Sequence, residues 1–295
     1  MRNFVMVVDS TADLPKELRD QYGILYCPMN INYEGKELKA SLDWEEYSPK
    51  ELYDWMREGK LIKTTQVPYQ VFYDKFKGLL EEDLDIIYLS CSSALSGSIN
   101  TAISVANELK EEYPDHKIYC VDSLISSLGQ GFMAIDAIKQ KQQGATIEEV
   151  VTWLNEHRLT YNQIATVASL DYLKRAGRVK TSKAFFGNLF NVKPLIISDV
   201  VGQNYAFKKA RGRSASLQEL VNYTKERIVD PENQVIGISH ADAFEDALMI
   251  KEELQKALPV KDIYISYIGP IVGSSVGPGT IGVYFVGPEV TIKGE

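Results

Sequence analysis

Four clusters of small polar residues in this sequence could contact a bound ligand. Each cluster follows a segment that has the pattern of a strand, and together they occupy residues 9–13, 64–66, 92–98 and 269–282. In an open α/β sheet, ligands bind beyond the carboxyl ends of the strands. The chemistries to weigh are therefore anion binding, nucleotide binding and hydrolysis by a serine nucleophile.

The cluster at residues 92–98 carries the most information. It reads Ser-Ser-Ala-Leu-Ser-Gly-Ser and joins a predicted strand, residues 85–90, to a predicted amphipathic helix, residues 98–112. The first N–H groups of a helix have no partner within the helix, so hydroxyls and free N–H groups meet here at a helix N-terminus, which favours anions. The alternative is that a serine of this loop merely caps the helix.

The cluster at residues 269–282 contains five glycines in fourteen residues. Glycine permits close approach of the backbone to a ligand, although a turn-rich linker before the last strand is an equal alternative. No Gly-Lys-Ser/Thr sequence follows, and no GxGxxG occurs within the cluster, so nucleotide binding is poorly supported.

A serine hydrolase would need a nucleophile, a histidine and an acid that meet in space. Ser96 is followed by Gly97, but the surrounding residues do not form GxSxG. His240 with Asp242 is the one histidine–acid pairing worth naming. Hydrolysis is therefore the weakest of the three chemistries.

Two arginine pairs have the chemistry to bind a carboxylate, a phosphate or an acidic partner surface. Arg175 and Arg178 form one compact basic segment, and Arg211 and Arg213 form another. The segment from Lys208 to Ser214 has no apolar periodicity, so we expect it to be exposed. Solvated charge with local ion pairs is the alternative for both pairs.

The composition excludes several other functions. A net charge of −8 argues against nucleic acid as the main partner. No apolar run is long enough for a transmembrane helix, and the apolar start is too short for a secretory signal, so we expect a cytoplasmic protein that allows at most peripheral membrane contact. The histidines and cysteines are too scattered for a metal site or a disulfide framework: His116, His157, His240, Cys27, Cys91 and Cys120.

Strands that alternate with helices predict an α/β fold with right-handed crossovers. In the first half we expect strands at 4–8, 24–33, 85–90 and 117–121, and helices at 49–58, 71–80, 98–112, 128–142 and 147–154, with Asp13 capping an earlier helix. In the second half we expect strands at 164–169, 192–197, 234–239, 261–267 and 281–286, and helices at 214–228 and 244–258. A polar hinge near residues 158–163 divides the chain into two α/β domains, 1–160 and 161–295, with a ligand cleft between them.

Taken together, these segments resemble the DegV family, the fatty-acid-binding FakB proteins of bacterial fatty acid kinase. The order and number of the matching motifs make chance agreement improbable. The motifs are Val-Asp-Ser-Thr-Ala-Asp-Leu-Pro at 8–15, Lys-Thr-Thr-Gln at 63–66, the Ser-Ser-x-Leu-Ser-Gly loop at 92–97, Asp-Ser at 122–123, Ser-Leu-Gly-Gln-Gly at 127–131, Ser-Leu-Asp-Tyr-Leu at 169–173 and Lys-Pro-Leu at 193–195.

The resemblance implies that one long-chain fatty acid lies between the two domains. Its carboxylate would be held by the hydroxyls of Thr64 or Thr65 and Ser96 and by the N–H of Gly97. A separate dihydroxyacetone-kinase-like subunit would phosphorylate the carboxylate to an acyl phosphate, so no catalysis, metal or further cofactor is expected of this chain. We expect Arg211 and Arg213 to contact that kinase.

One residue departs from the family pattern. Family members that serve the kinase commonly carry histidine in a Gly-x-His-x-Gly-Pro-Gly segment near the carboxylate, whereas this sequence has Ser275 in the corresponding stretch, 273–279. Serine can donate a hydrogen bond but cannot titrate near neutral pH. A fatty acid store or sensor without a kinase partner is therefore the alternative function.

Overall fold

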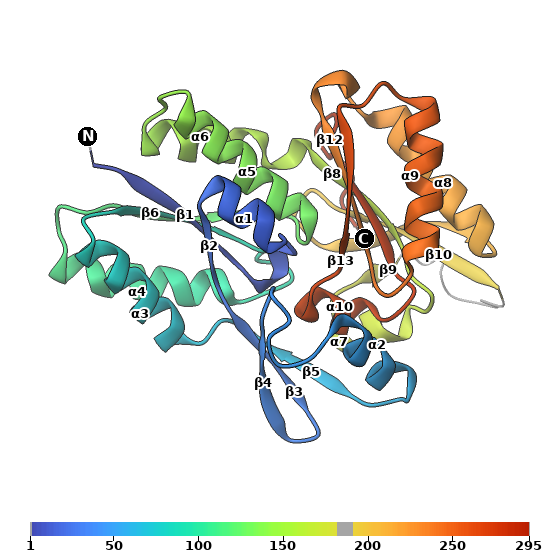
Figure 1. Cartoon of the computed structure of the whole chain (residues 1–295), viewed down its shortest axis with the longest axis horizontal. Helices are drawn as coiled ribbons and strands as arrows, with labels where there is room; N and C mark the ends of the chain where they lie inside the picture. Colours follow the sequence, from blue (N-terminus) through green and yellow to red (C-terminus); the bar gives the residue numbers. More distant parts are fainter. Residues whose placement is uncertain (1, 182–190, 295) are drawn as a thin grey trace.

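The computed structural model of the chain describes residues 2–181 and 191–294, which form three sheets and their flanking helices (Figure 1). The first sheet has four strands, all parallel, in the order β2-β1-β6-β7. Its strands are β1 (Phe4–Asp9), β2 (Ile24–Cys27), β6 (Asp85–Ser90) and β7 (Ile118–Asp122).

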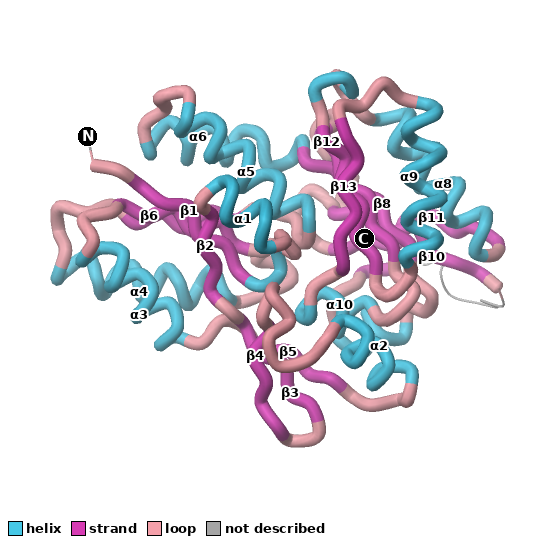
Figure 2. Tube along the Cα trace, in the orientation of Figure 1, coloured by secondary structure: helices cyan, strands magenta, loops and turns pink. Residues whose placement is uncertain are grey.

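Helices cover both faces of this sheet because both faces of its strands are apolar. Val7 and Tyr88 face one side and pack with α3 and α4, whereas Met6 and Leu89 face the other side and pack with α5 and α6. The resulting three layers are visible in Figure 2. The helices are α1 (Lys16–Tyr22), α3 (Tyr69–Glu81), α4 (Ser98–Glu112), α5 (Leu128–Gln142) and α6 (Ile147–His157).

A small antiparallel sheet, in the order β4-β3-β5, extends from the first one. It consists of β3 (Met29–Tyr33), β4 (Lys36–Ala40) and β5 (Ile62–Thr65), and it packs with α2 (Pro49–Arg57) and α10 (Pro270–Val276). The single strand predicted at 24–33 is wrong, because the chain leaves the first sheet at Pro28, which has no N–H for a sheet ladder.

The third sheet has seven strands in the order β13-β12-β14-β8-β10-β11-β9. Helices α8 (Arg213–Arg227) and α9 (Phe244–Ala257) cover one face, and α5 packs on the other face. The strands are β8 (Tyr161–Thr166), β9 (Lys180–Thr181), β10 (Val192–Ser198), β11 (Asn204–Arg211), β12 (Val235–His240), β13 (Asp262–Tyr267) and β14 (Ile281–Val286), and α7 (Asp171–Ala176) follows β8.

The structure confirms the α/β fold, with two further differences from the sequence prediction. The segment from Lys208 to Ser214, which we expected to be exposed, begins in strand β11, which pairs with β10; Lys208 and Arg211 are exposed, but Ala210 between them is buried. The glycine-rich segment at 269–282 is not merely a linker, because its first half forms helix α10. The division of the chain at residue 160 stays a prediction; α5 and α10 each pack against strands or helices from the other side of it.

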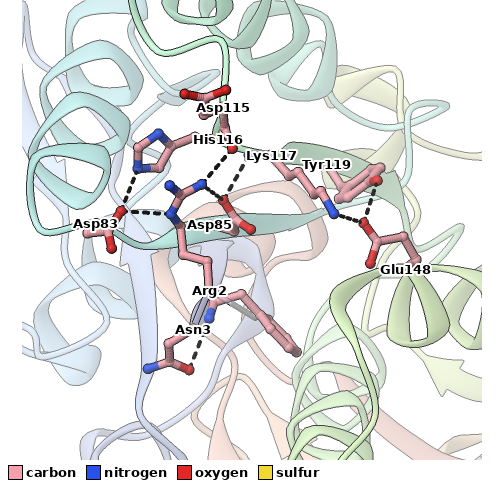
Figure 3. A network of polar contacts seen from close by, with 10 residues as sticks. Arg2, Asn3, Asp83, Asp85, Asp115, His116, Lys117, Tyr119 and Glu148 are labelled. Atoms are coloured by element: carbon pink, nitrogen blue, oxygen red, sulfur yellow. Dashed lines mark hydrogen bonds and ion pairs between the residues drawn. The ribbon is translucent and has the colours of Figure 1, made fainter.

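A polar network closes the amino-terminal edge of the four-stranded sheet (Figure 3). The guanidinium of Arg2 pairs with Asp83 at 2.7 Å and with Asp85 at 3.7 Å, and Asp85 also accepts the N–H of Lys117 at 2.9 Å. These contacts tie together the amino-terminal ends of the strands, whereas the carboxyl ends of the same strands are left for a ligand. Within residues 2–181 and 191–294, no helix has both the length and the apolar character to cross a bilayer.

Candidate functional site

A cavity of about 150 Å³ lies beyond the carboxyl ends of β1, β6 and β7 and is lined by residues of the loops that follow these strands, by the small antiparallel sheet, by Asn204 of the third sheet and by α10. All five residues that the sequence assigned to a carboxylate line this cavity. Thr64 and Thr65 end β5, Ser96 and Gly97 precede α4, and Ser275 lies on α10. Residues more than 200 positions apart in sequence thus meet at one place.

The hydroxyls in this cavity have spare hydrogen-bonding capacity. The Thr64 hydroxyl has no partner among the described residues, and the Thr65 hydroxyl donates only a long bond, 3.4 Å, to the carbonyl of Asn30. Ser126, from the loop between β7 and α5, also lines the cavity with a hydroxyl that has no partner in the described chain. These groups are free to bind a ligand oxygen.

Gly97 occupies the N-cap position of α4, and no side chain caps this helix. Ser96 lies outside the helix, where its Oγ accepts a 3.3 Å bond from the N–H of Ser98 and lies 3.0 Å from the Ser98 hydroxyl. Capping therefore does not account fully for Ser96. The end of the exposed Gln66 side chain lies close to Gly97, where a Cβ atom would be, so a larger residue at 97 would displace it.

Ser275 lies on a helix and not in a tight turn. Its hydroxyl donates to the carbonyl of Ile271 at 3.2 Å, one helical turn earlier. The same face of α10 contributes Ile271, Val272 and Val276 to the cavity. Ser275 is half-buried, so a larger side chain could extend from this face into open space.

Asp13 fixes the start of α10. The sequence suggested that it caps α1, but Pro15 occupies that position and Asp13 is 97 % buried beneath α10. Its Oδ1 accepts the N–H of Gly269 at 2.9 Å, and its Oδ2 lies 2.6 Å from the Ser127 hydroxyl. Burial raises the pKa of Asp13 to about 8, so the carboxyl is largely neutral at pH 7.

Arg178 and Asn204 belong to the cavity but were not assigned to it from the sequence. Arg178 is the only charged residue among the described residues that line the cavity, and its Nε donates to the carbonyl of Leu95 at 3.1 Å. The side chain of Asn204 donates to the carbonyl of Arg178 at 3.1 Å. A signal existed for Arg178: Gly177, at φ 69°, ends α7 and turns the chain back toward the cavity.

A basic outer cavity of about 320 Å³ adjoins the first one. Thr64, Arg178 and Ser275 line both. The outer cavity adds three cations, namely Lys60, Lys63 and Arg175. It offers an anionic group a route to the hydroxyls, in a protein whose net charge is −8.

An apolar extension of about 30 Å³ leads inward from the same cavity. The two spaces share five lining residues: Ser126, Leu173, Asn204, Val272 and Val276. Side chains from β8 and β10 add apolar walls, among them Ala165, Val167 and Ile196. Neutral donors at one end and aliphatic side chains at the other suit an amphiphilic ligand with a single anionic head.

Arg211 and Arg213 lie away from this cavity. Asn204, at the first residue of β11, lines the cavity, and Arg211 ends the same strand, seven residues and about 23 Å farther on. Arg211 is exposed, whereas Arg213 binds Asp246 of α9 through Nε at 2.9 Å and Nη2 at 2.7 Å. The contact of these arginines with a partner stays a prediction.

The structure does not assemble the hydrolase residues. His240 is buried against aromatic rings, and burial lowers its pKa to about 4. Its Nδ1 accepts the N–H of Ala243 at 3.3 Å, while Asp242 pairs with Arg57 at 2.6 Å. Ser96 contacts Ser98 instead. In the described ranges, no three His, Cys, Asp or Glu side chains come together as a metal site.

Comparison with known proteins decides the family. The model of the DegV family, which is described as an uncharacterised protein family, matches residues 3–287. The chain belongs to the DegV family. A DegV domain-containing protein of Clostridium perfringens is 39% identical over 287 residues, which cover 97% of this chain and 98% of that protein.

Two further DegV comparisons concern proteins described by their ligand. A fatty acid-binding protein of Thermotoga maritima is 31% identical over 285 residues, covering 94% of this chain and 95% of that protein. The structure described as fatty acid binding of a DegV family protein from Thermus thermophilus is 29% identical, covers 97% of this chain and 100% of that one, and superposes with a TM-score of 0.88. This chain and the Thermus thermophilus protein therefore share the DegV fold, with two α/β domains.

Proposed function

We propose that this DegV chain binds a long-chain fatty acid and presents its carboxylate to a separate kinase, which phosphorylates it to an acyl phosphate. The observation that carries the proposal is the polarity of the cavity, which has neutral hydroxyl and N–H donors at one end and an apolar extension at the other. The descriptions of the Thermotoga and Thermus relatives support the class of ligand.

Neutral donors suit a carboxylate that must react. The hydroxyls of Thr64, Thr65 and Ser96 and the N–H of Gly97 can bind both oxygens, and the N-terminus of α4 favours negative charge. A buried cation at the same place would hold the carboxylate more strongly and lower its reactivity. Arg178, at the rim, can attract the head group without being buried with it.

The acyl chain supplies most of the affinity. About a dozen buried CH₂ groups at roughly 0.8 kcal/mol each give on the order of 10 kcal/mol before the costs of association. The head-group contacts then fix the orientation of the ligand, with the carboxylate toward the basic outer cavity. A kinase that approaches this cavity would meet both the carboxylate and the cations that attract a phosphate donor.

Native mass spectrometry of the protein purified without detergent tests the ligand. We expect a bound species whose mass matches a fatty acid and which denaturation releases. A protein that is empty when purified, and that takes up no fatty acid on titration, would refute the proposal. Addition of the kinase and ATP to the loaded protein then tests the second part, with acyl phosphate as the expected product.

Ser96→Ala should weaken fatty acid binding by roughly tenfold to a hundredfold, because one hydrogen bond to a charged group contributes about 1.5–3 kcal/mol. The melting temperature should change little, since the bond that Ser96 accepts from the first N–H of α4, at Ser98, is long at 3.3 Å. Lipid titration beside a thermal melt measures both. Ser104→Ala removes an exposed serine of the same helix and is the matched control. Unchanged affinity in Ser96→Ala would remove Ser96 from the site.

Arg175→Ala should leave lipid affinity nearly intact and weaken engagement with the kinase up to about fivefold, as expected for an exposed charge. Arg211→Ala, about 23 Å along β11 from the cavity, should have a smaller effect of the same kind. Binding measured at low and high salt checks both, because a charge contact weakens with salt. Arg213 is a poor test, since its loss also breaks the ion pair to Asp246. A larger effect at Arg211 would move the kinase contact to that end of β11.

A store or sensor without a kinase is the second candidate. It is favoured by Ser275, whose hydroxyl already donates to the carbonyl of Ile271 and cannot titrate near neutral pH.

A further inference from the structure

The apolar extension of the cavity ends against β14, at Gly282 and Tyr284. These two residues share the face of β14 that points toward α5, because alternate side chains of a strand lie on the same face. Val283, between them, points to the other face and packs in the core with α8 and α9. Gly282 carries no side chain, and the Tyr284 ring lies over it: a Cβ atom at Gly282 would be 2.6 Å from the Tyr284 hydroxyl.

Tyr284 fills the gap between β14 and α5. It is 5% exposed, and a Cβ atom placed at Gly129 of α5 would lie 3.2 Å from its ring. Its hydroxyl accepts a 3.3 Å bond from Ser239 of the neighbouring strand β12. The ring is thus held on three sides, by its own strand, by α5 and by β12.

A second cavity, of about 220 Å³, begins on the other side of the same ring. Tyr284 lines both this cavity and the apolar extension. The second cavity is lined by aromatic and aliphatic side chains, including Phe132, Ile135 and Tyr264, and its wall also carries the charged residues Asp136, Lys139, Lys261 and Asp262. One aromatic side chain, Tyr284, therefore borders both the small apolar extension and this larger space.

We propose that Tyr284 is the end wall of the acyl channel and sets the longest fatty acid that binds along its whole length. This inference rests on the proposed function. Each methylene that enters the channel raises affinity about fourfold, so affinity rises with chain length until the terminal methyl group meets the ring. Methylenes beyond that length do not raise affinity further. A longer chain must fold back in the channel or move its carboxylate away from the hydroxyls that bind it.

Removing the wall joins the channel to the second cavity. In Tyr284→Ala, affinity should therefore continue to rise, about fourfold per added methylene, for fatty acids at which the wild type has reached its plateau. Gly282→Ala tests the opposite direction. Its Cβ atom would come within 2.6 Å of the Tyr284 hydroxyl and narrow the end of the channel, so the plateau should begin at a shorter acid.

The experiment is a titration of wild type and variants with laurate, myristate, palmitate, stearate, arachidate and behenate, beside a thermal melt of each protein. Tyr264→Ala is the matched control, because it removes a tyrosine ring from the far side of the second cavity and leaves the wall in place. It should keep the plateau of the wild type.

The outcomes separate the two proposals. If the wild type binds none of these acids, the proposed function fails. If the wild type binds but shows no plateau, or if Tyr284→Ala has the plateau of the wild type, Tyr284 is not the wall. Should Tyr284→Ala fail to fold, Gly282→Ala decides: a plateau at a shorter acid supports the wall, and an unchanged plateau overturns it.

Discussion

Asp13→Asn should make the protein more stable at pH 8 and should remove a fall in stability that the wild type shows between about pH 4 and about pH 8. The buried Asp13 carboxyl has its pKa raised from 3.8 to about 8 by desolvation, although bonds from Ser127 and Gly269 lower it in part. Below pH 4 the carboxyl is protonated in both the folded and the unfolded state, and its contribution to stability is fully present.

Between these pH values the unfolded state loses the proton while the folded state keeps it. Folding then requires uptake of a proton, and the free energy of unfolding falls by up to about 1.4 kcal/mol per pH unit. Above the folded-state pKa the carboxyl ionises in both states and the fall ends. Asparagine carries no such proton, so the slope due to this group disappears.

Asparagine also fits the hydrogen bonds of the neutral acid. In the structure the Ser127 hydroxyl donates to Asp13 Oδ2 at 2.6 Å; when Asp13 carries its proton this bond reverses, so that Ser127 can donate to Ser239 at 3.3 Å, and Ser239 donates to Tyr284. The side-chain amide of asparagine donates to Ser127 and accepts from Gly269 in the same way.

Denaturant unfolding across this pH range, for the wild type and the variants, measures the difference in slope. Asp13→Ala should be less stable than Asp13→Asn at every pH, because the N–H of Gly269 loses its acceptor. Asp20→Asn, at an exposed residue of α1 that pairs with Lys16, is the matched control and should follow the wild type. Parallel curves for Asp13→Asn and the wild type would show that Asp13 is ionised in the folded protein.

Ser275→His should raise the rate of acyl phosphate formation with a standard kinase subunit, on the order of a hundredfold if a protonated imidazole stabilises the negative charge where the carboxylate meets the transferred phosphoryl group. The prediction rests on the proposed kinase partnership. Ser275 lines both the inner cavity and the basic outer cavity, so a histidine on this face of α10 can reach between them. Lipid affinity should change little, since the acyl chain supplies most of it.

Wild type and Ser275→His are compared with the same kinase and the same fatty acid. Ser275→Asn is the control, because its side chain donates a hydrogen bond and has a similar size but does not titrate near neutral pH. A gain with histidine alone indicates that the charge of the imidazolium is needed, and an equal gain with asparagine indicates a hydrogen bond only. Full turnover by the wild type would show that histidine is not needed at this residue.

Patterns within single segments of the sequence were sufficient to place the residues that we expect to bind the carboxylate. The amphipathic periodicity placed α4 at its observed bounds, Ser98–Glu112, and the continuous apolar run placed β6 at Asp85–Ser90, so the loop between them was also correct. Because parallel strands bring their carboxyl ends to one edge, that loop and residues 9–13 had to lie close together. Thr64 and Thr65 were assigned through the family motif, since β5 itself was not predicted.

The apolar extension of the cavity depends on packing between distant segments, which the sequence alone does not reveal. Helix α10 contains glycine, which disfavours helices, but Gly273 faces the Tyr53 hydroxyl so closely that no side chain fits there. Strand β8 was predicted three residues too late, and the alternation of its side chains does not tell which of its two faces meets a cavity. The apolar walls at Ala165 and Val167 therefore could not be assigned in advance.

Because the cavity is built from segments that are far apart in the sequence, its parts are synthesised and can fold at different times. Thr11 and Ser96 leave the ribosome early, and the four-stranded sheet can form when β7 has been made, since domains generally fold as units from the N-terminus. Helix α10 comes after every described strand except β14, so a nascent chain has no complete carboxylate site until then. A ligand that binds only the finished site stabilises the product of folding and cannot act as a template for its early steps. Supply of fatty acid should therefore alter how long the completed protein survives in the cell, and not how efficiently its first sheet forms.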